Sequence, residues 1–131
     1  MAYPIGSGSE RLQRGAMHAL VSTATSFKFD GTFPATGTST YAVPANHLIT
    51  VLSIFWNNQT TTPTYFVLYV NPLGSSDEYK IIQRQYVGSR ATFVWDEKIV
   101  LHPTDKLVTY CPSQGSANID VYYTYVDQDW S

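Results

Sequence analysis

The feature that most constrains the fold is a series of short segments in which apolar side chains alternate with polar or mixed ones. In the last of them Ile119, Val121, Tyr123 and Tyr125 share one face of an extended chain. Period-two alternation is typical of a β-strand with one buried face. The prevailing residue types, Thr, Val, Ile, Tyr and Phe, also fit a pleated sheet better than a helix. The sequence therefore predicts an all-β protein.

The segments and the breaks between them predict one antiparallel β-sandwich. Breaks rich in Gly, Pro, Asn and Ser separate short strands at a spacing typical of two packed sheets. The run at residues 47–56 is apolar on both faces, as expected of a central strand. The other expected strands lie at residues 19–29, 64–70, 79–86, 91–95, 99–101, 106–111 and 118–126, with a shorter one that starts at residue 41 and enters a turn at Pro44.

The first 15 residues are predicted to form an arm outside the sandwich. They are polar and include Gly-Ser-Gly-Ser at residues 6–9, which lowers the chance that they pack alone. Ser9 could cap a short helix, but Gly15 weakens a helix, and residues 16–21 could equally begin a strand. The expected organisation is an N-terminal arm at residues 1–15 and a β-sandwich domain at residues 16–131.

Charge and hydropathy argue against two classes of partner. The formal net charge is −2, and Lys and Arg are scattered, so the basic stripe that neutralises phosphates is missing and no nucleic-acid partner is expected. No stretch approaches the roughly 18 apolar residues of a membrane span, and no secretion signal precedes the strands. We therefore expect a soluble protein with no membrane partner.

The single cysteine and one glycosylation sequon bear on the compartment. Cys111 is the only cysteine, so no intramolecular disulfide can form, and we expect synthesis in a reducing cytoplasm. Because Cys111 lies within a predicted strand, it is expected to be a small core residue. Asn58-Gln59-Thr60 fits the sequon, but without a secretion signal we do not expect it to be used.

No catalytic, cofactor-binding or metal-binding residue is predicted, and the chain is not expected to be an enzyme. His18, His47 and His102 lie in no recognisable nucleophile-base setting, and the ligand spacings of a zinc site are missing. No glycine-rich loop between a strand and a helix could cradle a phosphate. Asp77, Glu78, Asp96 and Glu97 flank predicted turns, where carboxylates are ordinarily just solvated.

One acidic cluster leaves an alternative open. Asp120, Asp127 and Asp129 could supply oxygen ligands to a calcium ion, although a solvated acidic tail is the stronger interpretation.

Aromatic residues are too numerous for the core of one small sandwich. Some of them are expected at the surface, where Tyr and Trp pack against other proteins or stack on sugar rings. The excess therefore fits an assembly subunit or a lectin-like module. The residues considered are Trp56, Tyr65, Tyr69, Tyr79, Tyr86, Trp95, Tyr110, Tyr122, Tyr123, Tyr125 and Trp130.

Two stretches resemble small β-sandwich virion proteins of tailed bacteriophages. Residues 41–60, YAVPANHLITVLSIFWNNQT, resemble the pattern VPAG…IxSIxVxNTT of those proteins. Residues 99–108, IVLHPTDKLV, resemble their strand-turn-strand pattern xVLxPGDxL. The chain departs from the patterns at Ala45-Asn46, where a glycine is usual, and at Thr104, which replaces the glycine before Asp105.

The resemblance implies a jelly-roll-like subunit on a virion, made in the host cytoplasm. It would be a capsid decoration (cement) protein, a homo-oligomer and often a trimer in such families, that binds the major capsid protein and stabilises the shell. A tail or neck component is the alternative within that class, and a carbohydrate-binding jelly-roll module is the alternative outside it. The arm at residues 1–15 would then be a tether that becomes ordered on a neighbouring subunit.

Overall fold

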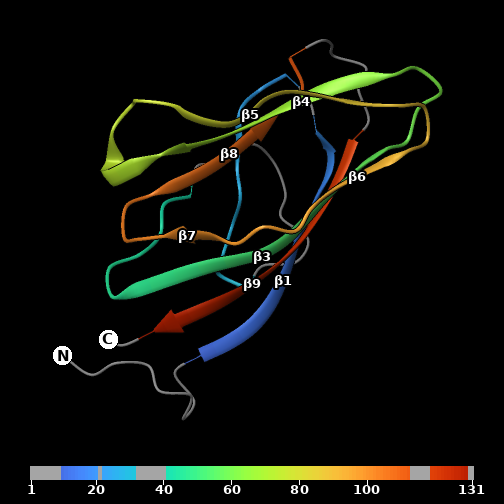
Figure 1. The fold of residues 1–131 in the computed structure, drawn as a ribbon. Helices are drawn as coiled ribbons and strands as arrows, with labels where there is room; N and C mark the ends of the chain where they lie inside the picture. Colours follow the sequence, from blue (N-terminus) through green and yellow to red (C-terminus); the bar gives the residue numbers. More distant parts are fainter. Residues whose placement is uncertain (1–9, 21, 32–40, 113–118, 130–131) are drawn as a thin grey trace.

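Two antiparallel β-sheets packed face to face form the protein (Figure 1), which confirms the all-β prediction. The computed structural model describes residues 10–20, 22–31, 41–112 and 119–129. Sheet A has the order β1-β9-β3-β6 with β7 also paired to β3, and sheet B has the order β2-β8-β4-β5. The strands are β1 (Glu10–Leu20), β2 (Thr25–Ser26), β3 (His47–Asn58), β4 (Thr64–Asn71), β5 (Tyr79–Val87), β6 (Thr92–Trp95), β7 (Ile99–Leu101), β8 (Lys106–Tyr110) and β9 (Ile119–Asp129).

The described residues include one helical turn, the 3₁₀ helix η1 (Pro72–Gly74). No helix among them has the length and apolar character to cross a membrane.

The strand pairing is that of a jelly roll. Both β6 and β7 pair with β3, so together they act as one interrupted strand. With that strand counted once, the first strand pairs with the last, and β2 pairs with β8, the last but one. In the same nested order β3 pairs with the interrupted strand and β4 pairs with β5, while β3 also pairs with β9 and β4 with β8 to join these pairs into the two sheets. A long antiparallel hairpin wrapped into two sheets produces this pattern, so the predicted jelly-roll-like sandwich is confirmed.

The core lies between the sheets and contains the inward side chains of both. The predicted alternation of β9 is confirmed, since Ile119, Val121, Tyr123 and Tyr125 are all buried. Cys111 is also buried, as predicted, and burial raises the pKa of its thiol to about 12.

A buried chain of contacts joins the two sheets. The ring of Trp56 on β3 stacks on Phe66 on β4, with centroids 4.0 Å apart. Trp56 Nε1 donates to Thr109 Oγ1 on β8 at 3.2 Å, and that hydroxyl donates to the carbonyl of Val67 at 2.7 Å. Because each buried polar group has a partner, the contacts fix the sheets without leaving an unsatisfied donor.

The predicted boundary between arm and sandwich is wrong for residues 10–15, which belong to β1 and pair with β9. The polar composition that suggested an arm is that of an edge strand, and its Gly15 lies against the core. The ring of Tyr123 lies so close that a Cβ on Gly15 would stand 2.2 Å from Tyr123 Cζ. Gly15, which argued against a helix in the sequence, is therefore a site of very close packing in a strand. The rest of the predicted arm, residues 1–9, lies outside the described residues.

The strand predicted at residues 19–29 is much shorter, because only Thr25–Ser26 pairs with β8 as a strand. The alternation that suggested it is still correct, since Phe27 and Phe29 are buried and Lys28 is less so. At Lys28 the hydroxyl of Tyr123 takes the place of a neighbouring strand. It accepts from the backbone N of Lys28 at 3.1 Å and donates to the Lys28 carbonyl at 2.7 Å.

The two stretches that resemble virion proteins meet in space. The backbone N of Val43 donates to the Asp105 carbonyl at 3.0 Å, and that of Thr104 donates to the Val43 carbonyl at 2.8 Å. These bonds take the place of the short strand predicted from residue 41. Asn46 and Thr104, which stand where glycine is usual, have φ of 65° and 72°. Both residues therefore occupy the left-handed region that favours glycine.

Candidate functional site

The histidines and carboxylates do not form a catalytic constellation in the described residues. His18 Nδ1 lies 2.7 Å from Asp120 Oδ1, and His47 Nδ1 lies 2.8 Å from Asp127 Oδ1. Within the parts of the chain that the structure describes, no serine or cysteine hydrogen-bonds to either ring. These pairs hold the ends of β1, β3 and β9 together, which is a structural role.

The acidic cluster is not a solvated tail. Asp127 is buried against His47, whose Nε2 also lies 3.7 Å from Asp129 Oδ2. Asp120 accepts from the backbone N of Ala19 at 3.0 Å as well as pairing with His18. Across the described ranges, no group of three or more His, Cys, Asp or Glu side chains is placed to hold a metal ion. The carboxylates that could have been calcium ligands are instead partners of histidines.

The sequon asparagine is buried and fully used by the fold. Asn58 Nδ2 lies 2.9 Å from the carbonyl of Thr62 and 3.2 Å from those of Val87 and Gly88. Its Oδ1 accepts from the backbone N of Thr60 at 2.9 Å and from Thr60 Oγ1 at 2.7 Å. In the folded protein this amide has no access to a glycan-transferring enzyme.

Two rows of side chains, mostly apolar, cross the outer face of sheet A, which we call the sheet A face. Cross-strand neighbours on one side of a sheet touch one another, so each row forms a continuous strip. Between the rows, Ser53 Oγ and Thr124 Oγ1 hydrogen-bond at 2.8 Å. The strand register places Ala16, Tyr122, Phe55 and Val94 in the first row and Leu12, Val126, Thr50 and Val100 in the second.

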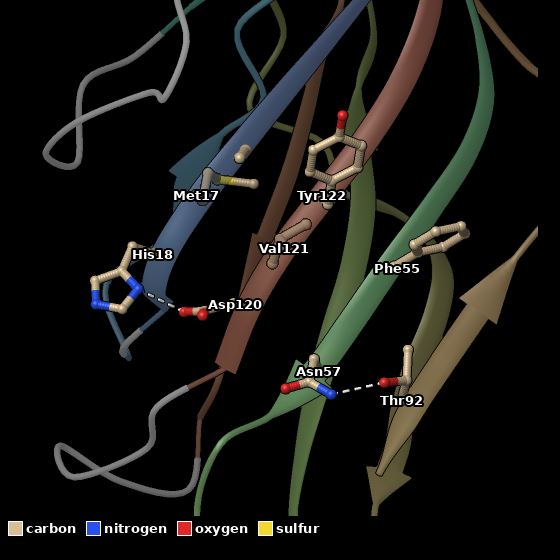
Figure 2. A pocket seen from close by; sticks show the side chains of 9 residues that line it. Met17, His18, Phe55, Asn57, Thr92, Asp120, Val121 and Tyr122 are labelled. Carbon is tan, nitrogen blue, oxygen red and sulfur yellow. Dashed lines mark hydrogen bonds and ion pairs between the residues drawn. The ribbon is translucent and has the colours of Figure 1, made fainter. Parts of the chain in front are cut away.

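The first row is hollowed, and Figure 2 shows this hollow from close by. Its volume is 360 Å³, and its apolar lining includes Ala16, Phe55 and Tyr122. The His18–Asp120 pair lies at one end. At the other end Asn57 Nδ2 donates to Thr92 Oγ1 at 2.6 Å. The side chains come from β1, β9, β3 and β6, strands that are far apart in the chain.

The chemistry of this sheet A hollow suits packing rather than reaction. Phe55 and Tyr122 remain 40% and 37% exposed, large values for apolar side chains at the middle of a sheet. The polar groups at both ends already bond to one another. Contiguous exposed apolar surface is typical of sites where another molecule packs. The sheet A face is the candidate functional site.

The predicted surface aromatics are confirmed in part. Tyr79, Tyr86 and Tyr122 are exposed, whereas Trp56, Tyr123 and Tyr125 are core residues. Trp130 lies outside the described residues. Phe55, the aromatic side chain in the sheet A hollow besides Tyr122, was not among the aromatics considered. The two-sided apolar run at residues 47–56 could have indicated that Phe55 lies at a surface site. Apolar side chains on the outer face of a central strand are expected to pack against another layer or another molecule.

These features define a class: a jelly-roll β-sandwich with an exposed apolar face on one sheet. No protein-family model matches the chain, and no curated protein matches it in sequence.

Solved structures are similar in fold. A Bacillus endospore appendage protein, of a family described as disulfide-linked pili, is 8% identical with a TM-score of 0.51, over 100% of this chain and 97% of that one. A structure of infectious bursal disease virus is 10% identical with a TM-score of 0.43, over 91% of this chain and 33% of that one. A xylan-binding domain of Paenibacillus barcinonensis is 8% identical with a TM-score of 0.42, over 94% and 86%. At this identity, the similarity to the appendage protein shows the fold alone.

Proposed function

We propose that this chain is a non-enzymatic structural subunit of a tailed-bacteriophage virion that docks through the sheet A face. The observation that carries the proposal is the pair of cross-strand rows, with Phe55 and Tyr122 exposed around an apolar hollow. Burying such side chains against a neighbour is favourable by about 25 cal/mol for each Å² of apolar surface. Aromatic residues at the centre of an interface supply much of its binding energy.

The particular subunit proposed is a capsid decoration protein that self-associates, with a trimer favoured, and binds the major capsid protein. The resemblance of residues 41–60 and 99–108 to small virion proteins supports this choice. Those stretches meet at the Val43–Thr104 contact, so they also have a structural reason to recur together.

A tail or neck component is the second candidate within this class. It rests on the same exposed face, since ring-shaped assemblies also need flat surfaces that self-associate.

The test uses a double variant at the hollow and a matched control. Phe55→Ser with Tyr122→Ser removes both exposed aromatic side chains from the sheet A face. Leu73→Ser removes another exposed apolar side chain, 76% exposed, from η1, which belongs to neither sheet. Light-scattering mass is measured for each protein, followed by sedimentation with empty phage shells and with isolated tails. Circular dichroism checks that each variant is folded.

We expect the wild type and Leu73→Ser to form a closed oligomer and to co-sediment with shells in a fixed ratio. The double variant should be a folded monomer that stays in solution. Sedimentation with tails alone would favour the second candidate. A wild-type monomer that ignores shells and tails would contradict both.

A further inference from the structure

The outer face of sheet B carries a second hollow, formed by aromatic and basic side chains. Strand register places Tyr110 beside Val67, Tyr65 beside Tyr86, and Tyr69 beside Lys80. A groove of 310 Å³ lies among Tyr65, Val67, Lys80, Arg84 and Tyr110. The sheets face opposite ways, so this groove is separate from the sheet A face. It consists of one strip of β4 flanked by β5 and β8.

Its aromatic rings are held in fixed positions. Tyr65 packs against Tyr86 with centroids 5.2 Å apart, and Tyr69 meets Tyr110 edge to face at 6.2 Å. Tyr65 and Tyr110 are only half-buried, and Tyr110 has part of its ring open to the groove, whereas the Arg84 guanidinium lies over the ring of Tyr65. Rings whose orientation is already set lose little freedom when a flat ligand packs on them.

Arg84 supplies a cation beside these rings. Its guanidinium carbon lies 4.3 Å from the centroid of Tyr65, and Nη2 donates to the Tyr65 hydroxyl at 3.5 Å. Arg84 is exposed, and no carboxylate in the described ranges forms an ion pair with it. Lys80 is different, because its Nζ lies 3.0 Å from Glu78 Oε1. Arg84 is therefore the cation available to a ligand.

We propose that this groove binds an acidic saccharide, with a sugar ring against Tyr110 and its carboxylate on Arg84, whose guanidinium is held over Tyr65. The apolar face of a sugar ring matches an aromatic face, and a planar guanidinium can hold a carboxylate through two parallel hydrogen bonds. The volume lies at the lower end of the range for small-molecule sites, which suits one or two sugar rings. The chain has 10 acidic and 8 basic residues, so a general excess of positive charge does not account for the cation at this groove.

The binding goes beyond the proposed structural role and does not depend on it. A virion subunit docked through sheet A would keep sheet B turned outward, toward whatever acidic glycans surround it. The test therefore uses the wild-type protein without shells, and the sheet A double variant serves as one control.

The protein is titrated with trigalacturonate and with neutral galactotriose. Binding is measured by calorimetry and by the NMR chemical-shift changes of the tyrosine rings. Arg84→Met keeps the length of the side chain but removes the charge. Lys98→Met removes an exposed charge from the turn between β6 and β7. We expect trigalacturonate to bind at least about tenfold more tightly than galactotriose, and Arg84→Met to weaken it by about tenfold or more.

Lys98→Met and the Phe55→Ser, Tyr122→Ser double variant should bind like the wild type, and Arg84→Lys should fall between wild type and Arg84→Met. Four results would overturn the proposal: no binding of trigalacturonate, equal binding of the neutral sugar, equal weakening by Lys98→Met, or full competition by inorganic sulfate at matched concentration. The last result would define a simple anion site in place of a saccharide site.

Discussion

Thr104 carries backbone strain that a glycine would not. Its φ of 72° lies in the left-handed region, and its side chain is β-branched, the kind that fits this region least well. Its backbone N and carbonyl bond to Val43 and Gly74, and these bonds do not need the side chain. The backbone hydrogen bonds of the turn therefore hold Thr104 in this strained conformation.

Replacing Thr104 by glycine should stabilise the protein by about 1 kcal/mol. Relief of the left-handed conformation, about 1–2 kcal/mol, exceeds the entropy that glycine loses on folding. Urea unfolding measures the change. Thr104→Ala is the control, because alanine keeps the Cβ and should recover little of the gain. An equal gain from alanine would show that the strain is not in the backbone.

Asn58 should be far more sensitive to substitution than its neighbour Asn57. Asn58→Ala leaves buried carbonyls of Thr62, Val87 and Gly88 without their donor, which should cost about 3 kcal/mol. Asn57 lies on the opposite face of β3 and bonds to Thr92 at the surface, so Asn57→Ala should cost less than about 1 kcal/mol. Denaturant unfolding of both variants gives the comparison. Equal losses would mean that Asn58 is not a structural anchor.

At the scale of elements, β1 is the strand that the sequence understated most. It is the edge strand of sheet A next to β9, and its pairing with β9 begins at Glu10, opposite Gln128. Gln13 within it accepts from the hydroxyl of Tyr125, and Gly15 gives room to the ring of Tyr123. β1 therefore helps to fix the positions of Tyr123 and Tyr125 on β9.

Deleting residues 1–15 should destabilise the sandwich, whereas deleting residues 1–9 removes none of the contacts described above. The longer deletion exposes the edge of β9 and removes the Gln13 acceptor of Tyr125, so we expect a loss of about 2 kcal/mol or more. Thermal unfolding compares the two truncations. If both unfold alike, the pairing of residues 10–15 contributes nothing to stability, and the predicted arm boundary would be restored.

At the scale of the whole molecule, the core is built on phenols and a thiol that must stay neutral. Burial is the main cause that raises the pKa of Tyr123 and Tyr125, and burial with the charge of Asp30 raises that of Tyr41. Burial also raises the pKa of Cys111 to about 12. In each case the folded state holds its proton more tightly than the unfolded state does.

Stability should therefore be constant at neutral pH and fall in alkali. Groups with a raised folded pKa stabilise fully below the unfolded pKa, which is 9.0 for the thiol and 10.0 for the phenols, and lose that contribution as the pH rises toward the folded values. Urea midpoints measured from pH 8 upward should begin to fall at about pH 9–10. Tyr123→Phe should be less stable at neutral pH but show a shallower alkaline loss. An identical slope in that variant would show that Tyr123 does not titrate on unfolding.

The sequence by itself determined the class of fold, the inward face of β9, the burial of Cys111 and most strand positions. Each of these follows from alternation and turn residues within a few neighbours in the chain. It also marked Asn46 and Thr104, because a missing glycine in a recurring turn is a local signal.

Only the tertiary structure decided that Gly15 lies against Tyr123, that β1 belongs to sheet A, and that Phe55 and Tyr122 share one hollow. The groove of Tyr65, Arg84 and Tyr110 was equally hidden. In a jelly roll the first strand pairs with the last, so each site collects residues from strands far apart in the chain. Pairing and register depend on those long-range contacts, and alternation within a strand carries no information on which neighbour it will meet.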